Sequence, residues 1–115
     1  MMETSTQPTQ QAMVVLCTCA SIDAAKPLAR ALVEESLAAC VNIVPGVISV
    51  YRWKDSLQEE VEVLLIIKTR REIFPFLEKR IRELHPYELP EILGVTVDSV
   101  FQQYFDWIRI NTRVL

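Results

Sequence analysis

The chain has 115 residues, of which 50% are hydrophobic and 23% are charged, a composition typical of one soluble globular domain. Twelve basic and fifteen acidic residues give a net charge of −3, and the basic residues have acidic neighbours, so nucleic acid is not expected as a partner. Glu62 interrupts the longest apolar run, residues 61–67, so we expect no membrane-spanning segment and no membrane partner.

The first twelve residues are polar and lack the basic and apolar regions of a secretory signal. We expect residues 1–12 to form a disordered tail and residues 13–115 to form a single domain. A cytoplasmic protein is therefore expected, and its three cysteines should stay reduced.

The first two predicted elements are a strand and a helix. A continuous apolar run over residues 13–18 predicts a buried strand, and residues 23–36 carry apolar side chains at helical spacing. Pro27 makes the start of this helix ambiguous. With Asp23 as the cap, Pro27 lies in the first turn, where no N–H is needed; with Ser21 as the cap, it lies deeper and should kink the helix. We favour the start at Asp23.

Residues 40–70 contain two long runs of β-branched and alternating apolar residues, separated by a charged and polar break, KDSLQEEV (residues 54–61). They predict a hairpin with arms of about a dozen residues, against about 5–6 for the usual strand. Pro45-Gly46 predicts a bulge or bend in an edge strand. A small domain cannot cover both faces of such a hairpin, so we expect another copy of the chain to cover it.

The second half of the chain predicts helix, strand and helix. Residues 73–84 have helical spacing with Pro75 in the first turn, and the segment HPYELPE (85–91) ends this helix and is stiffened by two prolines. A strand over residues 92–97 and an aromatic helix over residues 101–108 follow. The order βαββαβ plus a terminal helix predicts an α+β, ferredoxin-like sandwich with an antiparallel sheet and two helices on one face.

Thiols and one imidazole are the candidate metal ligands. Cys17 and Cys19 lie two residues apart and should project to the same side of a strand, which suits a soft ion such as Cu(I). Cys17 and Cys40 equally suit positions in a hydrophobic core. His85 either complements a helix C-terminus or forms a site with the rigid segment after it.

A cleft is the second candidate site. Glu62 and Lys68 lie on one face of a predicted strand among apolar neighbours, where unpaired charges are costly. They lie either at exposed stretches of the strand or in a cleft against a partner chain. Four aromatic residues suit the wall of such a cleft or a subunit interface: Tyr51, Trp53, Tyr104 and Trp107. Nucleotide-binding loops, a nucleophile elbow and paired catalytic carboxylates are absent from the sequence, so we do not expect an enzyme.

Four segments together resemble the CutA family of divalent-cation tolerance proteins: LAACVNIVPGVISVYRW, E-x-E-V-L-L-I-I-K-T, HPYELPEI and Y-F-D-W-I. They occur in the family's order, and the resemblance covers residues 14–111. It implies a ferredoxin-like fold and a PII-like homotrimer in which long hairpins pack between subunits. It also implies association with copper, as Cu(I) or Cu(II), or with another divalent metal, and no established catalytic reaction.

The same resemblance assigns candidate site residues. The family's proposed metal ligands fall on Cys17 and His85, with Cys40 as a further candidate. The polar residues of the family's intersubunit cleft map to Tyr51, Trp53, Glu62, Lys68, Thr69, Glu91, Tyr104 and Trp107. Two positions depart from the family pattern. Asp55 replaces a glycine, so we expect a different hairpin tip, and Cys19 replaces a residue that is usually not a thiol, so it either adds a ligand or has no role.

Two functions follow from these patterns. The first is a trimeric protein that binds metal ions or confers metal tolerance through Cys17, Cys19, Cys40 and His85. The second is a PII-like sensor that binds a small polar ligand in the intersubunit cleft and has no essential metal. A scaffold that anchors another protein is a further alternative.

Overall fold

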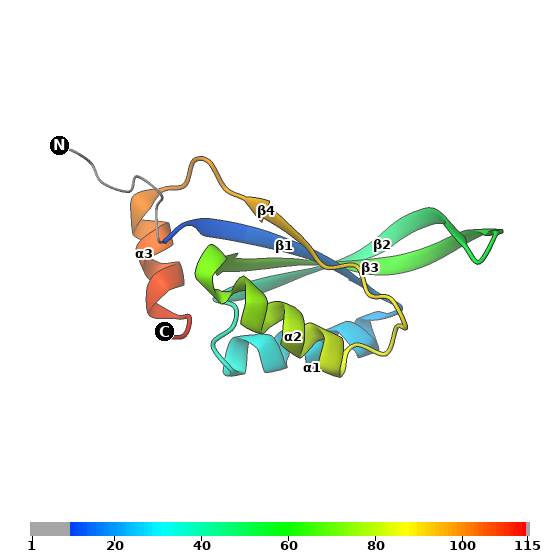
Figure 1. Ribbon diagram of the computed structural model, residues 1–115, viewed down its shortest axis with the longest axis horizontal. Helices are drawn as coiled ribbons and strands as arrows, with labels where there is room; N and C mark the ends of the chain where they lie inside the picture. The colour runs from blue at the N-terminus through cyan, green and yellow to red at the C-terminus, as the bar shows by residue number, and fades with distance from the viewer. Residues whose placement is uncertain (1–9, 115) are drawn as a thin grey trace.

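The computed structural model describes residues 10–114. The elements in this range are β1 (Ala12–Cys19), α1 (Ile22–Glu34), β2 (Cys40–Trp53), β3 (Ser56–Arg70), the 3-10 helix η1 (Arg71–Ile73), α2 (Phe74–Leu84), β4 (Leu93–Thr96) and α3 (Gln102–Ile110). The strands form one antiparallel sheet in the order β2-β3-β1-β4. Helices α1 and α2 cover one face of this sheet, and α3 lies at the end away from the hairpin tip (Figure 1). The predicted ferredoxin-like α+β fold is confirmed.

The hydrophobic core lies between the sheet and the two helices. Side chains of alternate strand residues, among them Val15, Leu65 and Ile67, face the helices and are fully buried. Leu32 of α1 and Ile81 of α2 pack against them from the helix side. Each aliphatic side chain buried in this way stabilises the fold by about 1.5–3 kcal/mol. The same alternation along β1 places every second residue of that strand in the core.

The hairpin β2–β3 extends beyond the body and gives the molecule a length of 56 Å against 29 and 25 Å in the other directions (Figure 1). The strand pairing shifts in register between Val44 and Val47, and Gly46 has a φ of 78°. Because β2 is an edge strand, the predicted bulge at Pro45-Gly46 of an edge strand is confirmed.

The tip of the hairpin is tighter than the predicted polar break over residues 54–61. Only Lys54 and Asp55 connect the strands, with φ values of 51° and 65°. Two consecutive residues with positive φ are typical of a type I′ turn, whose twist matches that of the paired strands. The rest of the predicted break is paired strand, because a strand that projects into solvent accepts polar residues on both faces.

The start of α1 corrects the predicted cap at Asp23. Ser21 is the N-cap, and its Oγ accepts a hydrogen bond from the N–H of Ala24 at 3.1 Å. Asp23 instead lies in the first turn, where a carboxylate favours the positive end of the helix dipole. Pro27 is therefore inside the helix, where it leaves the carbonyl of Asp23 without its usual intrahelical donor.

The domain also begins slightly before the predicted boundary at residue 13. The strand β1 starts at Ala12, and the carbonyl of Gln11 accepts a hydrogen bond from the N–H of Arg71 at 2.8 Å. Residues 1–9 of the predicted tail lie outside the described residues. Among the helices of residues 10–114, none combines the length and the apolar composition that a membrane crossing requires.

Candidate metal centre and adjoining cleft

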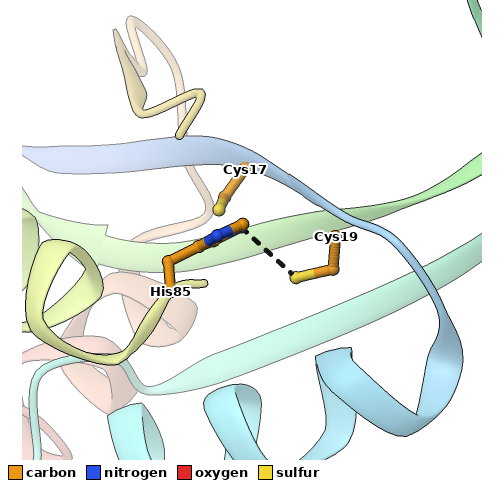
Figure 2. A group of neighbouring side chains, drawn as sticks. All are labelled: Cys17, Cys19 and His85. Atoms are coloured by element: carbon orange, nitrogen blue, oxygen red, sulfur yellow. Dashed lines mark hydrogen bonds between the residues drawn. The ribbon is translucent and has the colours of Figure 1, made fainter. Parts of the chain in front are cut away.

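Three potential metal ligands converge inside the core. Cys17 and Cys19 project from the helix-facing side of β1, and His85 follows the last residue of α2. The two sulfur atoms and an imidazole nitrogen all lie within 4.8 Å of one another, and the side chains point toward a common space (Figure 2). The exposed fractions are 0%, 1% and 7%, so water is largely excluded from this group. We call Cys17, Cys19 and His85 the thiol–imidazole group.

Hydrogen bonds fix the orientation of His85. The backbone N–H of Tyr87 donates to Nδ1 at 3.1 Å, so Nδ1 is an acceptor and Nε2 carries the proton of the neutral ring. Nε2 donates to the carbonyl of Thr18 at 2.7 Å and lies 3.8 Å from the sulfur of Cys19. The nitrogen turned toward the thiols is thus Nε2, and the bond from Tyr87 to the other nitrogen keeps the proton on Nε2.

The two thiols differ in their tendency to ionise. A hydrogen bond with Cys19, followed by burial, raises the pKa of Cys17 above its usual range. The same hydrogen bond lowers the pKa of Cys19, against the opposing effects of burial and of the Glu62 carboxylate. A thiolate is the form in which cysteine binds metal ions, and a thiolate at Cys19 makes ionisation of Cys17 harder.

The donor set restricts the ions that fit. Two sulfur ligands and one imidazole suit soft ions such as Cu(I), whereas Mg²⁺ and Ca²⁺ prefer oxygen ligands. The thiol–imidazole group fits a soft ion in a site of low coordination number. Ligand binding by Nε2 requires loss of its proton and of its bond to the Thr18 carbonyl.

Cys40 lies outside the thiol–imidazole group. It is the first residue of β2, is half-buried and is paired with Lys68 of β3. Burial, and then the electrostatic effect of Cys40, raise the pKa of Tyr104 on α3. The structure therefore brings together three of the four predicted metal ligands and leaves Cys40 apart within one chain.

A cleft of about 810 Å³ adjoins the group between the hairpin and the segment after α2. Its walls carry four carboxylates: Glu60, Glu62, Glu88 and Glu91. The hydroxyl of Tyr51 donates to Glu60 at 2.6 Å, and that of Tyr87 donates to Glu62 at 2.7 Å. The first bond raises the pKa of Tyr51 to about 12, while burial and then the bond to Glu62 raise that of Tyr87. Both phenols therefore remain protonated donors at neutral pH.

The structure divides the predicted cleft residues into two sets. Tyr51, Trp53, Glu62 and Glu91 line the cleft. Lys68, Thr69, Tyr104 and Trp107 lie elsewhere. Glu62 and Lys68 share a face of β3, but six residues of strand separate them by about 20 Å.

The second set makes other contacts within the described chain. Lys68 donates to Asn42, and the buried hydroxyl of Thr69 donates to the carbonyl of Leu37 at 2.8 Å. Tyr104 and Trp107 stack on each other on α3 with ring centroids 5.6 Å apart, and both are partly exposed. These contacts give Thr69 a structural role and leave the two aromatic rings available to an interface.

Sequence reasoning missed the part of Tyr87 in this arrangement. Tyr87 touches His85 through its backbone and its ring, and it reaches Glu62 through its hydroxyl. The sequence feature that points to Tyr87 is its position two residues after His85, in a segment that two prolines make rigid. The bond to Glu62 joins residues 25 positions apart and leaves no mark in the sequence.

The fold and the site together define a class of protein: a ferredoxin-like α+β domain with an extended hairpin and a buried thiol–imidazole group. The family model described as CutA1 divalent ion tolerance protein matches residues 13–111. The chain therefore belongs to the CutA1 divalent ion tolerance protein family, and the resemblance seen in the sequence is confirmed.

Individual relatives agree with this assignment. The chain is 50% identical over 99 residues to the divalent-cation tolerance protein CutA of Thermus thermophilus, covering 86% of this chain and 96% of that protein. It is 42% identical over 96 residues to human protein CutA, covering 84% of this chain and 54% of the human protein. The crystal structure of CutA1 from Oryza sativa superposes with a TM-score of 0.87 at 39% identity and covers 90% and 94% of the two chains.

Proposed function

We propose that this protein binds copper as Cu(I) through the thiol–imidazole group, as a homotrimer that contributes to tolerance of metal ions. One observation carries the proposal: three soft ligand atoms from Cys17, Cys19 and His85 lie within 4.8 Å of one another in a buried position. The family's relation to divalent cations supports a role in tolerance of metal ions, whereas the choice of Cu(I), a monovalent ion, rests on the two sulfur ligands and the imidazole. Burial excludes water, which keeps a bound Cu(I) from oxidation and exchange.

The roles of the chain's own groups follow from their geometry. Cys19 and Cys17 supply sulfur ligands, and His85 supplies Nε2. The N–H of Tyr87 orients the imidazole so that Nε2 faces the sulfur atoms, but it favours the proton on Nε2; metal binding there requires the proton to move to Nδ1 and the bond from Tyr87 to break. No catalytic step is proposed, and a cytoplasmic location is proposed because its reducing conditions keep these thiols free.

Titration of the reduced protein with chelator-buffered Cu(I) tests the proposal. We expect one ion per chain, with affinity weakened by His85→Ala or Cys17→Ser and retained by Cys40→Ser, the control that removes a thiol outside the group. Equal binding by the wild type and by the triple variant Cys17→Ser, Cys19→Ser, His85→Ala would contradict the proposal.

Exposed apolar side chains support the trimer. Ile48, Leu57 and Val61 on the hairpin are 67%, 70% and 67% exposed, and Phe101 near α3 is 71% exposed. Large apolar side chains grouped on one projecting element are typical of a surface that packs against another protein. Copies of the same chain supply that cover in a closed assembly.

The cleft favours a second candidate function, a PII-like sensor of a small ligand that needs no metal. A volume of about 810 Å³ is ample for a small molecule, and four carboxylates with aromatic walls suit a polar or cationic one. A thermal-shift screen of metal-free protein with nucleotides, small acids and amines tests this. A ligand at 100 times its Kd should stabilise the protein by about 2.7 kcal/mol. No shift across the panel would count against this candidate.

A further inference from the structure

We propose that the cleft is the path by which metal ions reach the thiol–imidazole group, and that the hydrogen bond from Tyr87 to Glu62 is a latch that controls passage. The inference rests on the proposed metal-binding function and adds to it the control of entry and exit. The three ligand side chains are at most 7% exposed, so an ion from solvent needs a path to reach them.

The cleft and the thiol–imidazole group share a wall. Thr18 and Tyr87 both line the cleft. The carbonyl of Thr18 accepts from Nε2 of His85 at 2.7 Å, and the N–H of Tyr87 donates to Nδ1 at 3.1 Å. Since Thr18 also lies between the two cysteines in β1, the layer between the cleft and the ligands is one residue thick.

Tyr87 closes this wall with three contacts. Its backbone holds His85, and its ring lies against the imidazole with centroids 4.6 Å apart and an interplanar angle of 59°. Its hydroxyl reaches across to Glu62 of β3 at 2.7 Å. Rotation of the ring away from His85 requires that the bond to Glu62 break, so this bond sets the cost of opening.

The bond is well suited to act as a latch. Glu62 is only 6% exposed, and no lysine or arginine in residues 10–114 forms an ion pair with it. A hydrogen bond to a buried charged acceptor is stronger than one between neutral groups. The other side-chain link between the hairpin and this segment, Lys54 to Glu88 at 3.8 Å, is more than two-thirds exposed and therefore weak.

The charge of the cleft favours cations at the latch. Glu60, Glu62 and Glu91 have no basic partner among the described residues, and Arg52 is the basic residue on the cleft walls. A concave surface with excess negative charge raises the local concentration of cations and their rate of association. The cleft thus concentrates cations beside Thr18 and Tyr87, the two wall residues that contact His85.

The test compares two phenols that each donate to a glutamate of the cleft, Tyr87 beside His85 and Tyr51 away from it. Tyr87→Phe removes the latch and keeps the ring, whereas Tyr51→Phe removes the matched bond to Glu60 on the same cleft but away from His85. Both are made in the full chain with Cys40→Ser, so that Cys17 and Cys19 are the only thiols. Access to the two thiols is measured without metal, as the rate at which iodoacetamide alkylates them, and intact mass follows the reaction. The free energy of unfolding is measured for the same proteins.

We expect Tyr87→Phe to alkylate about 10- to 150-fold faster than its Cys40→Ser parent, the range that corresponds to losing a hydrogen bond to a charged group. Tyr51→Phe should match the parent. Glu62→Gln, which keeps an acceptor oxygen for Tyr87, should show a smaller increase than Tyr87→Phe. With chelator-buffered Cu(I), Tyr87→Phe should load and release the ion faster by similar factors, with little change in affinity.

The outcomes separate the latch from the metal-binding function. Equal alkylation rates in Tyr87→Phe and the parent overturn the latch, even if Cu(I) binds normally. The latch is also overturned if Tyr51→Phe raises the alkylation rate as much as Tyr87→Phe does, because general destabilisation of the fold then explains both variants. Faster alkylation in Tyr87→Phe alone, with no Cu(I) bound by the wild type, overturns the metal-binding function and leaves Tyr87 as the control of access to the thiols.

Discussion

Ser21 sets the start of α1 and thereby places Pro27 in the helix interior. The capping bond to Ala24 contributes about 1 kcal/mol, and it starts the helix two residues earlier than a cap at Asp23 would. The proline is tolerated because its ring faces solvent and because the buried residues Leu28 and Leu32 hold the next turns against the sheet.

Pro27→Ala should therefore stabilise the protein. The substitution restores an N–H for the carbonyl of Asp23 and removes a ring from the helix interior, so we expect a gain of about 1–3 kcal/mol in the free energy of unfolding. Urea unfolding at fixed protein concentration measures it, with the exposed neighbour Lys26→Ala as the control. Unchanged stability would show that the helix has already adapted to the proline.

Cys19 is the residue on which the metal proposal depends most specifically. If it is a ligand, Cys19→Ser should weaken Cu(I) binding by about tenfold or more, since even the loss of a group that only hydrogen-bonds to a metal ligand costs about 10–100-fold. Competition with a Cu(I) chelator measures the affinity, and Cys40→Ser again serves as the matched loss of a thiol. Equal affinity in the two variants would remove Cys19 from the site and leave a two-ligand arrangement of Cys17 and His85.

At the scale of elements, the hairpin tip carries strain that substitution should reveal. Asp55 has a φ of 65°, a conformation that glycine adopts without cost and alanine does not. We expect Asp55→Gly to raise the free energy of unfolding by about 0.5–1 kcal/mol and Asp55→Ala to lower it by a similar amount. Thermal unfolding of the two variants beside the wild type tests the prediction, and effects of the same sign in both would contradict it.

The contact between α1 and α2 should make stability depend on pH. Glu35, the C-cap of α1, accepts from Arg80 of α2 at 2.8 and 3.0 Å, and this hydrogen bonding lowers the pKa of Glu35 below its usual value of 4.5. A carboxylate with a lowered pKa in the folded state stabilises the fold above its unfolded pKa, and the effect is lost as pH falls through the folded value. Glu35→Gln should thus lower the melting temperature at pH 7 and have little effect near pH 3.

Glu34→Gln is the control for this experiment, because Glu34 is exposed and forms no ion pair among residues 10–114. Melting temperatures of the three proteins between pH 3 and pH 7 give the comparison. A constant difference between Glu35→Gln and the wild type over this range would show that the ion pair contributes nothing.

The order of elements was predictable because each has a clear hydrophobic period. The alternation in residues 61–67 marks a strand, and the same rule places Cys17 and Cys19 on one face of β1. Turn and cap positions were less predictable, because Ser21 and Asp23 are both good N-caps and only packing decides between them.

The site was predictable only where it follows from local geometry. That His85 meets the two thiols depends on how α2 crosses the sheet, which no local pattern encodes. The separation of Glu62 from Lys68 could have been anticipated from the rise of a strand, but the pairing of Glu62 with Tyr87 could not, since it depends on the path of the segment after α2.

For the whole molecule, the hairpin is the feature that demands a partner. Trp53 at its tip is half-buried within one chain, with the ammonium of Lys54 5.5 Å from the centre of its ring. If the hairpin packs between copies, Trp53→Ala should weaken assembly by about 2–4 kcal/mol, the usual size of a hot-spot truncation. Light scattering over a range of concentrations, combined with thermal unfolding, measures this. A folded monomer at micromolar concentration with the same melting temperature in both proteins would overturn the trimer.

The alternation of Cys17, Thr18 and Cys19 along β1 has a consequence for the fidelity of folding. A slip of one residue between β1 and β3 would turn the hydroxyl of Thr18 toward the helices and expose both sulfurs on the opposite face. An ion that requires both sulfurs and His85 would bind only chains with the native strand alignment. Such an ion would act as a proofreader of the sheet, stabilising correctly aligned molecules and leaving misaligned ones open to degradation.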